Sequence, residues 1–188
     1  MTKMVDTEYE QDYFTQNPYK PYGDFIPHED RVQKLIEMFH PHSVLDVGCA
    51  YGFIVKRLID KGIDAWGCDV SKWCQEQAKQ VIPSRFVCTP AWDLSFFANK
   101  SFDLVYCEGV LEHIPEDKIN LTFQEFARVG KRFCLQVAFS EHPNFDIEPG
   151  HVCKHSLSWW IDKIPPNSFL AAQDGGSEQV RIWAYKRK

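Results

Sequence analysis

The chain has 188 residues, of which 44% are hydrophobic and 14% aromatic. This composition is typical of a folded globular domain and excludes a disordered or fibrous protein. The net charge of −5 disfavours a nucleic-acid partner, because such a partner requires a large basic face.

Membrane and redox signals are also missing from the sequence. No apolar run is long enough to span a membrane, and the first residues lack the apolar core of a signal peptide. The seven cysteines are scattered and form no CxxC pair. We therefore expect a cytoplasmic protein with reduced, buried thiols and no membrane partner.

The amino-terminal segment, residues 1–27, is rich in aromatic residues and contains three prolines. Prolines interrupt helices and strands, so this segment is not expected to form one regular element. Its many aromatic rings are poorly placed in water, which predicts an arm that packs back over the rest of the chain. We expect a single domain over residues 1–188, with an arm at 1–27 and a core at 28–188. The aromatic residues of the arm are Tyr9, Tyr13, Phe14, Tyr19, Tyr22 and Phe25.

Beyond Pro27 the apolar spacing alternates between helical and strand-like periods. Helices are expected at residues 28–40, 54–61, 72–82, 115–129 and 157–164, with Ser71 and Ser156 as amino-terminal caps. Strands are expected at residues 44–47, 65–69, 85–88, 102–107 and 133–139. Two further β-like runs, around Phe169 and over 180–185, flank the turn residues 174–176. This alternation predicts a Rossmann-like, doubly wound α/β fold, with a mostly parallel sheet, helices on both faces and an antiparallel C-terminal hairpin strand.

Three predicted strand ends carry residues that suit a bound nucleotide. In the run 46–52 (DVGCAYG), Asp46 precedes two glycines that let the backbone approach a ligand closely. Asp69 lies 21 residues after Gly48, and its carboxylate can accept hydrogen bonds from both ribose hydroxyls. Glu108 ends the fourth strand. Each feature alone is explained by a tight turn or a helix cap, but their order and spacing favour a nucleotide-type ligand.

Two ligands fit such a site, a nicotinamide dinucleotide and S-adenosylmethionine. The dinucleotide fingerprint is GxGxxG, in which backbone amides face an anionic pyrophosphate. Here the spacing is Gly48-x-x-x-Gly52, and Asp46 stands immediately before it. A carboxylate at that place repels pyrophosphate and attracts an ammonium or a sulfonium, so the charges favour S-adenosylmethionine.

Three stretches of the chain resemble the class I S-adenosylmethionine-dependent methyltransferases, especially the small type 11 and type 23 groups. They are VLDVGCAYG at 44–52, GCDVS at 67–71 and FDLVYCEGVLEHIP at 102–115. The resemblance covers roughly residues 30–140 and implies a methyltransferase with S-adenosylmethionine as cofactor. It further implies a loop beneath the methionine part of the cofactor, formed by Asp46, Gly48, Ala50 and Gly52. Asp69 would bind the ribose hydroxyls, and the backbone carbonyl of Glu108 would lie near the methionine end. The contacts to adenine would come from Val70, Ala91 and Trp92.

Two positions depart from the family pattern. Ala50 stands where the family usually has its middle glycine, and its methyl group is expected to be tolerated there if φ is negative. The acidic residue that reads adenine in the family would fall near Pro90, and Asp93 is expected to substitute through a shifted loop. From the arm, Tyr13 or Tyr22 is expected to reach the carboxylate of the cofactor.

A base is useful in this chemistry because an amine or hydroxyl acceptor must lose a proton. Our candidates for the base are His113 and His151, and His142 and His155 lie nearby in sequence. For His113 a purely structural role at the start of a helix is an equal alternative. No metal is expected, because the spacing of the nearby metal-ligating residues matches no strong zinc pattern. These residues are Glu148, His151, Cys153 and His155.

The acceptor is only broadly indicated by the sequence. The loop at 140–156 is the longest stretch without a predicted element and, with the arm, is expected to line a site for a small organic acceptor, methylated on O or N. Protein and tRNA acceptors stay open, as does the oligomeric state. Two other functions also stay open: a catalytically inactive relative that binds a partner protein, and a nicotinamide-nucleotide oxidoreductase.

Overall fold

The computed structural model describes residues 9–16, 22–24, 26–140, 150–166, 168–173 and 181–186. The chain divides into two compact units, Met1–Ala91 and Trp92–Lys188, which we describe one after the other. The single domain expected from the sequence stays a prediction.

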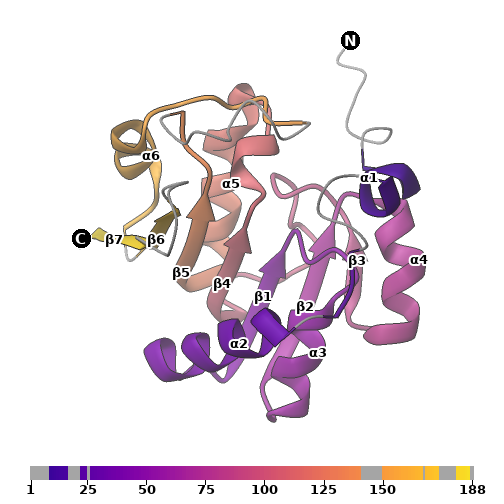
Figure 1. Cartoon of the computed structure of the whole chain (residues 1–188). Coiled ribbons are helices and arrows are strands. Elements are labelled where there is room, and N and C mark those ends of the chain that lie inside the picture. The colour runs from indigo at the N-terminus through magenta and orange to yellow at the C-terminus, as the bar shows by residue number, and fades with distance from the viewer. Residues whose placement is uncertain are drawn as a thin grey trace. The chain divides into compact units, whose positions relative to one another are not determined.

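The first unit contains three parallel strands in the order β3-β2-β1 (Figure 1). Val47 of β1 lies opposite Cys68 of β2, so the two strands end side by side. The strands follow the predicted apolar runs, at β1 (Ser43–Val47), β2 (Asp64–Asp69) and β3 (Phe86–Cys88). The helices are α1 (Gln11–Gln16), α2 (Ile26–Phe39), α3 (Phe53–Asp60) and α4 (Lys72–Val81).

Local chemistry explains where these helices begin and how they pack. Ser71 caps α4 as predicted, because its side chain accepts a hydrogen bond from the backbone N–H of Cys74 at 3.1 Å. Helix α3 packs on β1 and β2 and lies beside α2 (Figure 1). Arg57 of α3 pairs with Asp24 and, at 3.4 Å, with Glu29 of α2. The pair with Glu29 links α3 to α2, and the pair with Asp24 links α3 to the residues before α2.

The second unit contains the parallel strands β4 (Phe102–Glu108), β5 (Gly130–Val137) and β6 (Ser168–Gln173), in that order. Strand β7 (Arg181–Lys186) pairs with β6 in the antiparallel sense, and the predicted turn residues 174–176 lie outside the described residues. The helices are the 3₁₀ turn η1 (Leu111–His113), α5 (Glu116–Val129) and α6 (Leu157–Lys163). Ser156 caps α6 as predicted, accepting from the N–H of Trp159 at 3.2 Å.

Some boundaries differ from the sequence prediction. Strand β5 begins at Gly130 and not at residue 133, because Gly130 already pairs with Phe102 of β4. The polar residues 131 and 132 hid this start, since they interrupt the apolar run that served as the signal. The short helix α1 was not predicted either, and it lies within the segment where the prolines argued against regular structure.

The interior of each unit is apolar, as the continuous strand patterns predicted. Fully buried residues include Val44 and Leu58 in the first unit and Val105 and Phe126 in the second. All seven cysteines are free thiols, and all but Cys88 are buried. None of the helices in the described part of the chain is long and apolar enough to cross a membrane.

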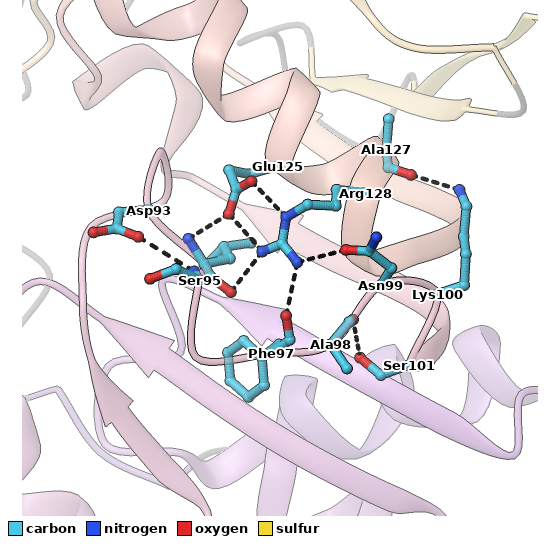
Figure 2. A network of polar contacts seen from close by, with 11 residues as sticks. Asp93, Ser95, Phe97, Ala98, Asn99, Lys100, Ser101, Glu125, Ala127 and Arg128 are labelled. Carbon is cyan, nitrogen blue, oxygen red and sulfur yellow. Dashed lines mark hydrogen bonds and ion pairs between the residues drawn. The ribbon is translucent and has the colours of Figure 1, made fainter.

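Arg128 of α5 fastens the loop between β3 and β4 to the second unit (Figure 2). Its guanidinium donates to the carbonyl oxygens of Phe97 at 2.7 Å and Leu94 at 2.8 Å, and to the side chain of Asn99 at 3.0 Å. Glu125 accepts from Arg128 at 2.7 Å and also from the N–H of Leu94 at 2.7 Å. The planar guanidinium therefore satisfies backbone groups that no helix or sheet serves.

We predict that Arg128→Met will destabilise the protein by about 2–3 kcal/mol, because two carbonyl groups of the loop lose a charged donor. Thermal unfolding of the purified variant measures this. Lys131→Met is the matched control: Lys131 pairs with Asp103 at 2.8 Å on the surface, so its loss should cost less than about 0.5 kcal/mol. Equal effects of the two substitutions would contradict the role given to Arg128.

Candidate cofactor site

The loop after β1 has an unusual backbone conformation. Gly48, Ala50 and Gly52 have φ values of 79°, 46° and 83°, all in the left-handed region. The condition set for Ala50 in the sequence analysis, a negative φ, is therefore not met, and this residue carries strain of about 1 kcal/mol. The loop is held at its start because the N–H groups of Gly48 and Cys49 both donate to the carbonyl of Cys68, at 2.8 and 3.1 Å.

Asp69 connects this loop to the end of β2. Its carboxylate accepts one hydrogen bond from the N–H of Ala50 and one from the N–H of Ser71, both at 2.9 Å. Burial raises the pKa of Asp69 above its ordinary value, while hydrogen bonds from Ser71, Ala50 and Val70 oppose that shift. The same contacts hold Ala50 in its strained conformation. The carboxylate thus lies at the end of β2, beside the glycine loop.

Part of the aromatic arm packs on the same loop. Phe14 is buried against Ala50 and Cys74, and the ring of Tyr22 lies 5.0 Å from that of Tyr51. The hydroxyl of Ser71 donates to the carbonyl of Tyr9 at 2.5 Å, which ties the arm to the start of α4 (Figure 1). In the described part of the arm, aromatic rings therefore cover the segment that follows β1.

Two further predicted residues, Asp46 and Tyr13, lie in this part of the first unit. Asp46 is only 4% exposed. Its negative charge, together with burial, raises the pKa of Tyr22 well above the ordinary value, burial being the larger cause. The ring of Tyr13 lies 5.1 Å from that of Phe14. The structure therefore brings Asp46, the loop, Asp69 and the arm together within the first unit.

Of the remaining cofactor candidates, Val70 follows Asp69 in the first unit, and the others lie at residues 91–92, where the first unit ends and the second begins, or later in the chain. Ala91 is buried and ends the first unit, and Trp92 begins the second. The exposed Asp93 accepts from the N–H of Ser95 at 3.2 Å, and hydrogen bonds with Ser95 lower the pKa of its carboxyl. The side chain of Glu108, at the end of β4, accepts from the hydroxyl of Tyr106. The roles expected of these residues toward adenine and methionine stay predictions.

The two candidate bases are neighbours in the second unit. The ring centroids of His113 and His151 lie 4.7 Å apart. Burial and the adjacent His151 lower the pKa of His113 to about 4, and a hydrogen bond to the carbonyl of Gly150 acts in the opposite direction. His113 is therefore neutral at neutral pH. Of the other histidines, His155 stacks on Trp159 with centroids 3.7 Å apart, and residue 142 lies outside the described residues.

Glu112, for which the sequence indicated only a structural role with His113 at the start of a helix, completes this cluster. It is 3% exposed, and its Oε1 accepts from the N–H of Ala138 at 3.1 Å. Its backbone carbonyl accepts from the N–H groups of Val152 and Cys153, both at 2.9 Å. These contacts bring the segment that contains His151 to η1. The consecutive Glu112 and His113 after a strand were the one available sequence signal.

Comparisons relate the chain to known proteins. The family model described as "Methyltransferase domain" matches residues 44–132. An uncharacterized methyltransferase of Bacillus thuringiensis (strain Al Hakam) is 24% identical over 140 residues, which cover 72% of this chain and 66% of that protein. A ubiquinone biosynthesis O-methyltransferase of Chromobacterium violaceum is 30% identical over 79 residues, which cover 39% of this chain and 34% of that protein. The chain thus spans less than two thirds of the length of either relative.

A solved structure gives the same picture of the fold. A SAM dependent methyltransferase from Archaeoglobus fulgidus matches with a TM-score of 0.59 and 19% identity, over 72% of this chain and 64% of that chain. At this identity the likeness concerns the fold alone. It confirms the predicted Rossmann-like, mostly parallel α/β class.

Gly52 offers a test of the loop geometry. A Cβ atom at Gly52 would overlap the side chain of Ile82, whereas one at Gly62 would meet nothing within 4 Å, although φ is similar at the two positions (83° and 81°). We predict that Gly52→Ala costs about 2 kcal/mol more stability than Gly62→Ala, which carries backbone strain only. Urea unfolding of both variants measures the difference. Similar losses would mean that Ile82 does not limit the space at Gly52.

His113 predicts a pH dependence of stability. Its pKa is about 4 in the folded protein and about 6.5 in the unfolded chain, so the unfolded state binds more protons between these values. Its contribution is complete above pH 6.5 and is lost as the pH falls, by about 2 kcal/mol between pH 7 and pH 5. Urea unfolding at both pH values, in buffer with a chelator, should show that His113→Gln removes this dependence. The control His42→Gln, at an exposed histidine, should keep the wild-type difference.

Proposed function

We propose that the chain transfers a methyl group from S-adenosylmethionine to an O or N atom of a small organic acceptor. This proposal starts from its membership of the class I S-adenosylmethionine-dependent methyltransferases. The observation that carries this proposal is the junction of Asp69 with the glycine loop. Its carboxylate lies at the end of β2 and binds the N–H of Ala50, so one anionic group adjoins the strained loop after β1. That combination suits the ribose and methionine parts of one ligand.

The charges near the loop support S-adenosylmethionine over a dinucleotide. Asp46 is buried directly before the loop. Together with burial, which is the larger cause, its negative charge raises the pKa of Tyr22. A ligand with an ammonium and a sulfonium is attracted to that charge, whereas a pyrophosphate is repelled. The oxidoreductase alternative therefore has no support from this part of the chain.

Each candidate residue has a proposed role toward the cofactor. The backbone at Gly48, Ala50 and Gly52 passes beneath the methionine part, and Asp69 accepts from the ribose hydroxyls. Glu108 offers its backbone carbonyl to the methionine end, and Tyr13 or Tyr22 reaches the carboxylate of the cofactor. Around the adenine we place Val70, Ala91, Trp92 and Asp93.

The reaction requires positioning and removal of a proton. When bound, S-adenosylmethionine supplies the methyl group, whose bond to sulfur breaks as the acceptor's lone pair bonds to the methyl carbon. We propose that His113 or His151 accepts the proton that the acceptor loses. His113 is uncharged at neutral pH, but its pKa of about 4 makes it a weak base. His151 is half-buried, so it can pass the proton to water.

Two observations bear on the nature of the acceptor. The loop at 140–156 is proposed to form the acceptor side, of which residues 150–156 belong to the described part of the chain. The Chromobacterium relative is an O-methyltransferase by name, which supports oxygen as the acceptor atom. An inactive relative that binds a partner protein is the second candidate, and the positive φ of Ala50, which stands in place of the family's glycine, favours it.

The proposal is tested by titrating the purified chain with S-adenosylhomocysteine in a calorimeter, with a nicotinamide dinucleotide in parallel. We predict micromolar binding of the former alone. Asp69→Asn should weaken this binding at least about tenfold, because a neutral amide holds the ribose less well. Asp64→Asn is the matched control: it makes the same change at the opposite end of β2, where Asp64 pairs with Arg85 on the surface, and should bind as the wild type does.

A loss of stability must be separated from a loss of binding in this test. Gly62→Ala introduces backbone strain at a glycine whose added Cβ would meet nothing within 4 Å, so it supplies a destabilised protein that should still bind. If Gly62→Ala and Asp69→Asn weakened binding equally, Asp69 would have a structural role only. If the wild type bound neither cofactor, the inactive relative would become the better proposal.

A further inference from the structure

We propose that Glu112, His113 and His151 bind one divalent transition-metal ion, such as Zn²⁺, Co²⁺ or Fe²⁺. Each side chain offers one ligand atom, and these atoms all lie within 4.8 Å of one another. Among the described residues, this is the one group of three His, Cys, Asp or Glu side chains that meets so closely. It shares only His151 with the four residues whose spacing matched no zinc pattern in the sequence.

The backbone holds the three ligands in place. Glu112 and His113 are consecutive residues of η1, which follows β4. His151 belongs to a different segment, which is fastened to η1 because the carbonyl of Glu112 accepts from the N–H groups of Val152 and Cys153 at 2.9 Å. The ligands therefore come from two segments that hydrogen bonds join directly beside the site. Such support is what a preorganised metal site requires.

The surroundings also orient two of the ligands. Oε1 of Glu112 accepts from the N–H of Ala138, which fixes the plane of the carboxylate. A ring nitrogen of His113 is hydrogen-bonded to the backbone carbonyl of Gly150, which fixes the orientation and tautomer of the ring. Histidines that bind metals commonly donate their second ring N–H to a carbonyl or carboxylate in this way.

The ligand set selects the class of metal. Two imidazoles and one carboxylate suit first-row transition ions, whereas Mg²⁺ and Ca²⁺ prefer oxygen ligands alone. Ligand atoms around tetrahedral zinc lie about 3.4 Å apart, so atoms that lie up to 4.8 Å apart here must approach by up to about 1.4 Å. His151 is only half-buried, so its side chain has room to make this shift. Three protein ligands leave at least one position open for water or an acceptor oxygen.

A role of the metal in catalysis rests on the proposed methyl transfer. An acceptor hydroxyl bound at the open position would have a lower pKa and would release its proton to water before attack on the methyl carbon. No oxidation or reduction is involved. His113 and His151 would then be ligands, and the base would not be needed. Metal binding itself does not depend on whether the chain transfers methyl groups.

The test uses the full chain after treatment with a chelator. Titration with Co²⁺, followed by visible absorption, and with Zn²⁺, followed by calorimetry, should give one ion per chain with micromolar affinity or better. His151→Ala should weaken binding at least about 100-fold, since one of three ligands is lost. His151→Cys should restore binding of Zn²⁺, because a thiolate is also a zinc ligand. Glu112→Gln should weaken binding while its side-chain oxygen can still accept from Ala138.

His155→Gln is the matched control, because it removes the next histidine of the same segment, one that stacks on Trp159. It should bind Co²⁺ as the wild type does. Absence of stoichiometric Co²⁺ or Zn²⁺ binding by the wild type, or equal losses in His151→Ala and His155→Gln, would overturn the proposal. Titration of S-adenosylhomocysteine in the same samples keeps the two proposals apart: metal binding without cofactor binding would reject the proposed function and not the metal site.

Discussion

The carboxylate of Asp69 holds the end of β2 to the loop after β1. It accepts from the N–H of Ala50 on one side and from that of Ser71 on the other. Ala50 has a positive φ that an alanine adopts only against a cost, so an outside contact must stabilise it. The carboxylate supplies that contact, and its burial there raises its pKa. The conformation of the loop and the position of the Asp69 carboxylate therefore depend on each other.

The same residues determine where the aromatic arm packs. Ser71 caps α4 through its side chain and also donates to the carbonyl of Tyr9. Phe14 fills the space against Ala50 and Cys74. A few polar groups thus connect the end of β2, the loop after β1, the cap of α4 and the arm. A substitution in one of these elements must therefore affect the others. This coupling is why a test of ligand binding here has to be accompanied by a test of stability.

The second unit uses its polar groups in two different ways. Around Arg128 a charged donor satisfies backbone carbonyls, and the result is a fixed loop (Figure 2). Around Glu112 a buried carboxylate lies beside two partly buried imidazoles. Burial of the carboxylate is unfavourable unless hydrogen bonds or a bound cation compensate for it. A fixed loop explains the first group completely, whereas the second has the composition of a binding site.

The sequence by itself determined the fold class and the order of the strands and longer helices, because these depend on local apolar periods and short motifs. It also predicted both serine caps correctly, since a cap depends on hydrogen bonds within a single turn. It failed at the start of β5, where pairing with β4 extends a strand through residues without an apolar signal. Local patterns cannot show such pairing.

The tertiary structure decided which of the candidate residues meet. Pairing of β1 with β2 brings Ala50 to Asp69, although each residue belongs to a different motif. Hydrogen bonds from Val152 and Cys153 to Glu112 bring His151 to His113, although nothing in the sequence links these segments. Spacing along the chain therefore indicated which reactive side chains were available. Only the pairing of distant backbone groups determined which of them meet, because such pairing depends on the whole fold.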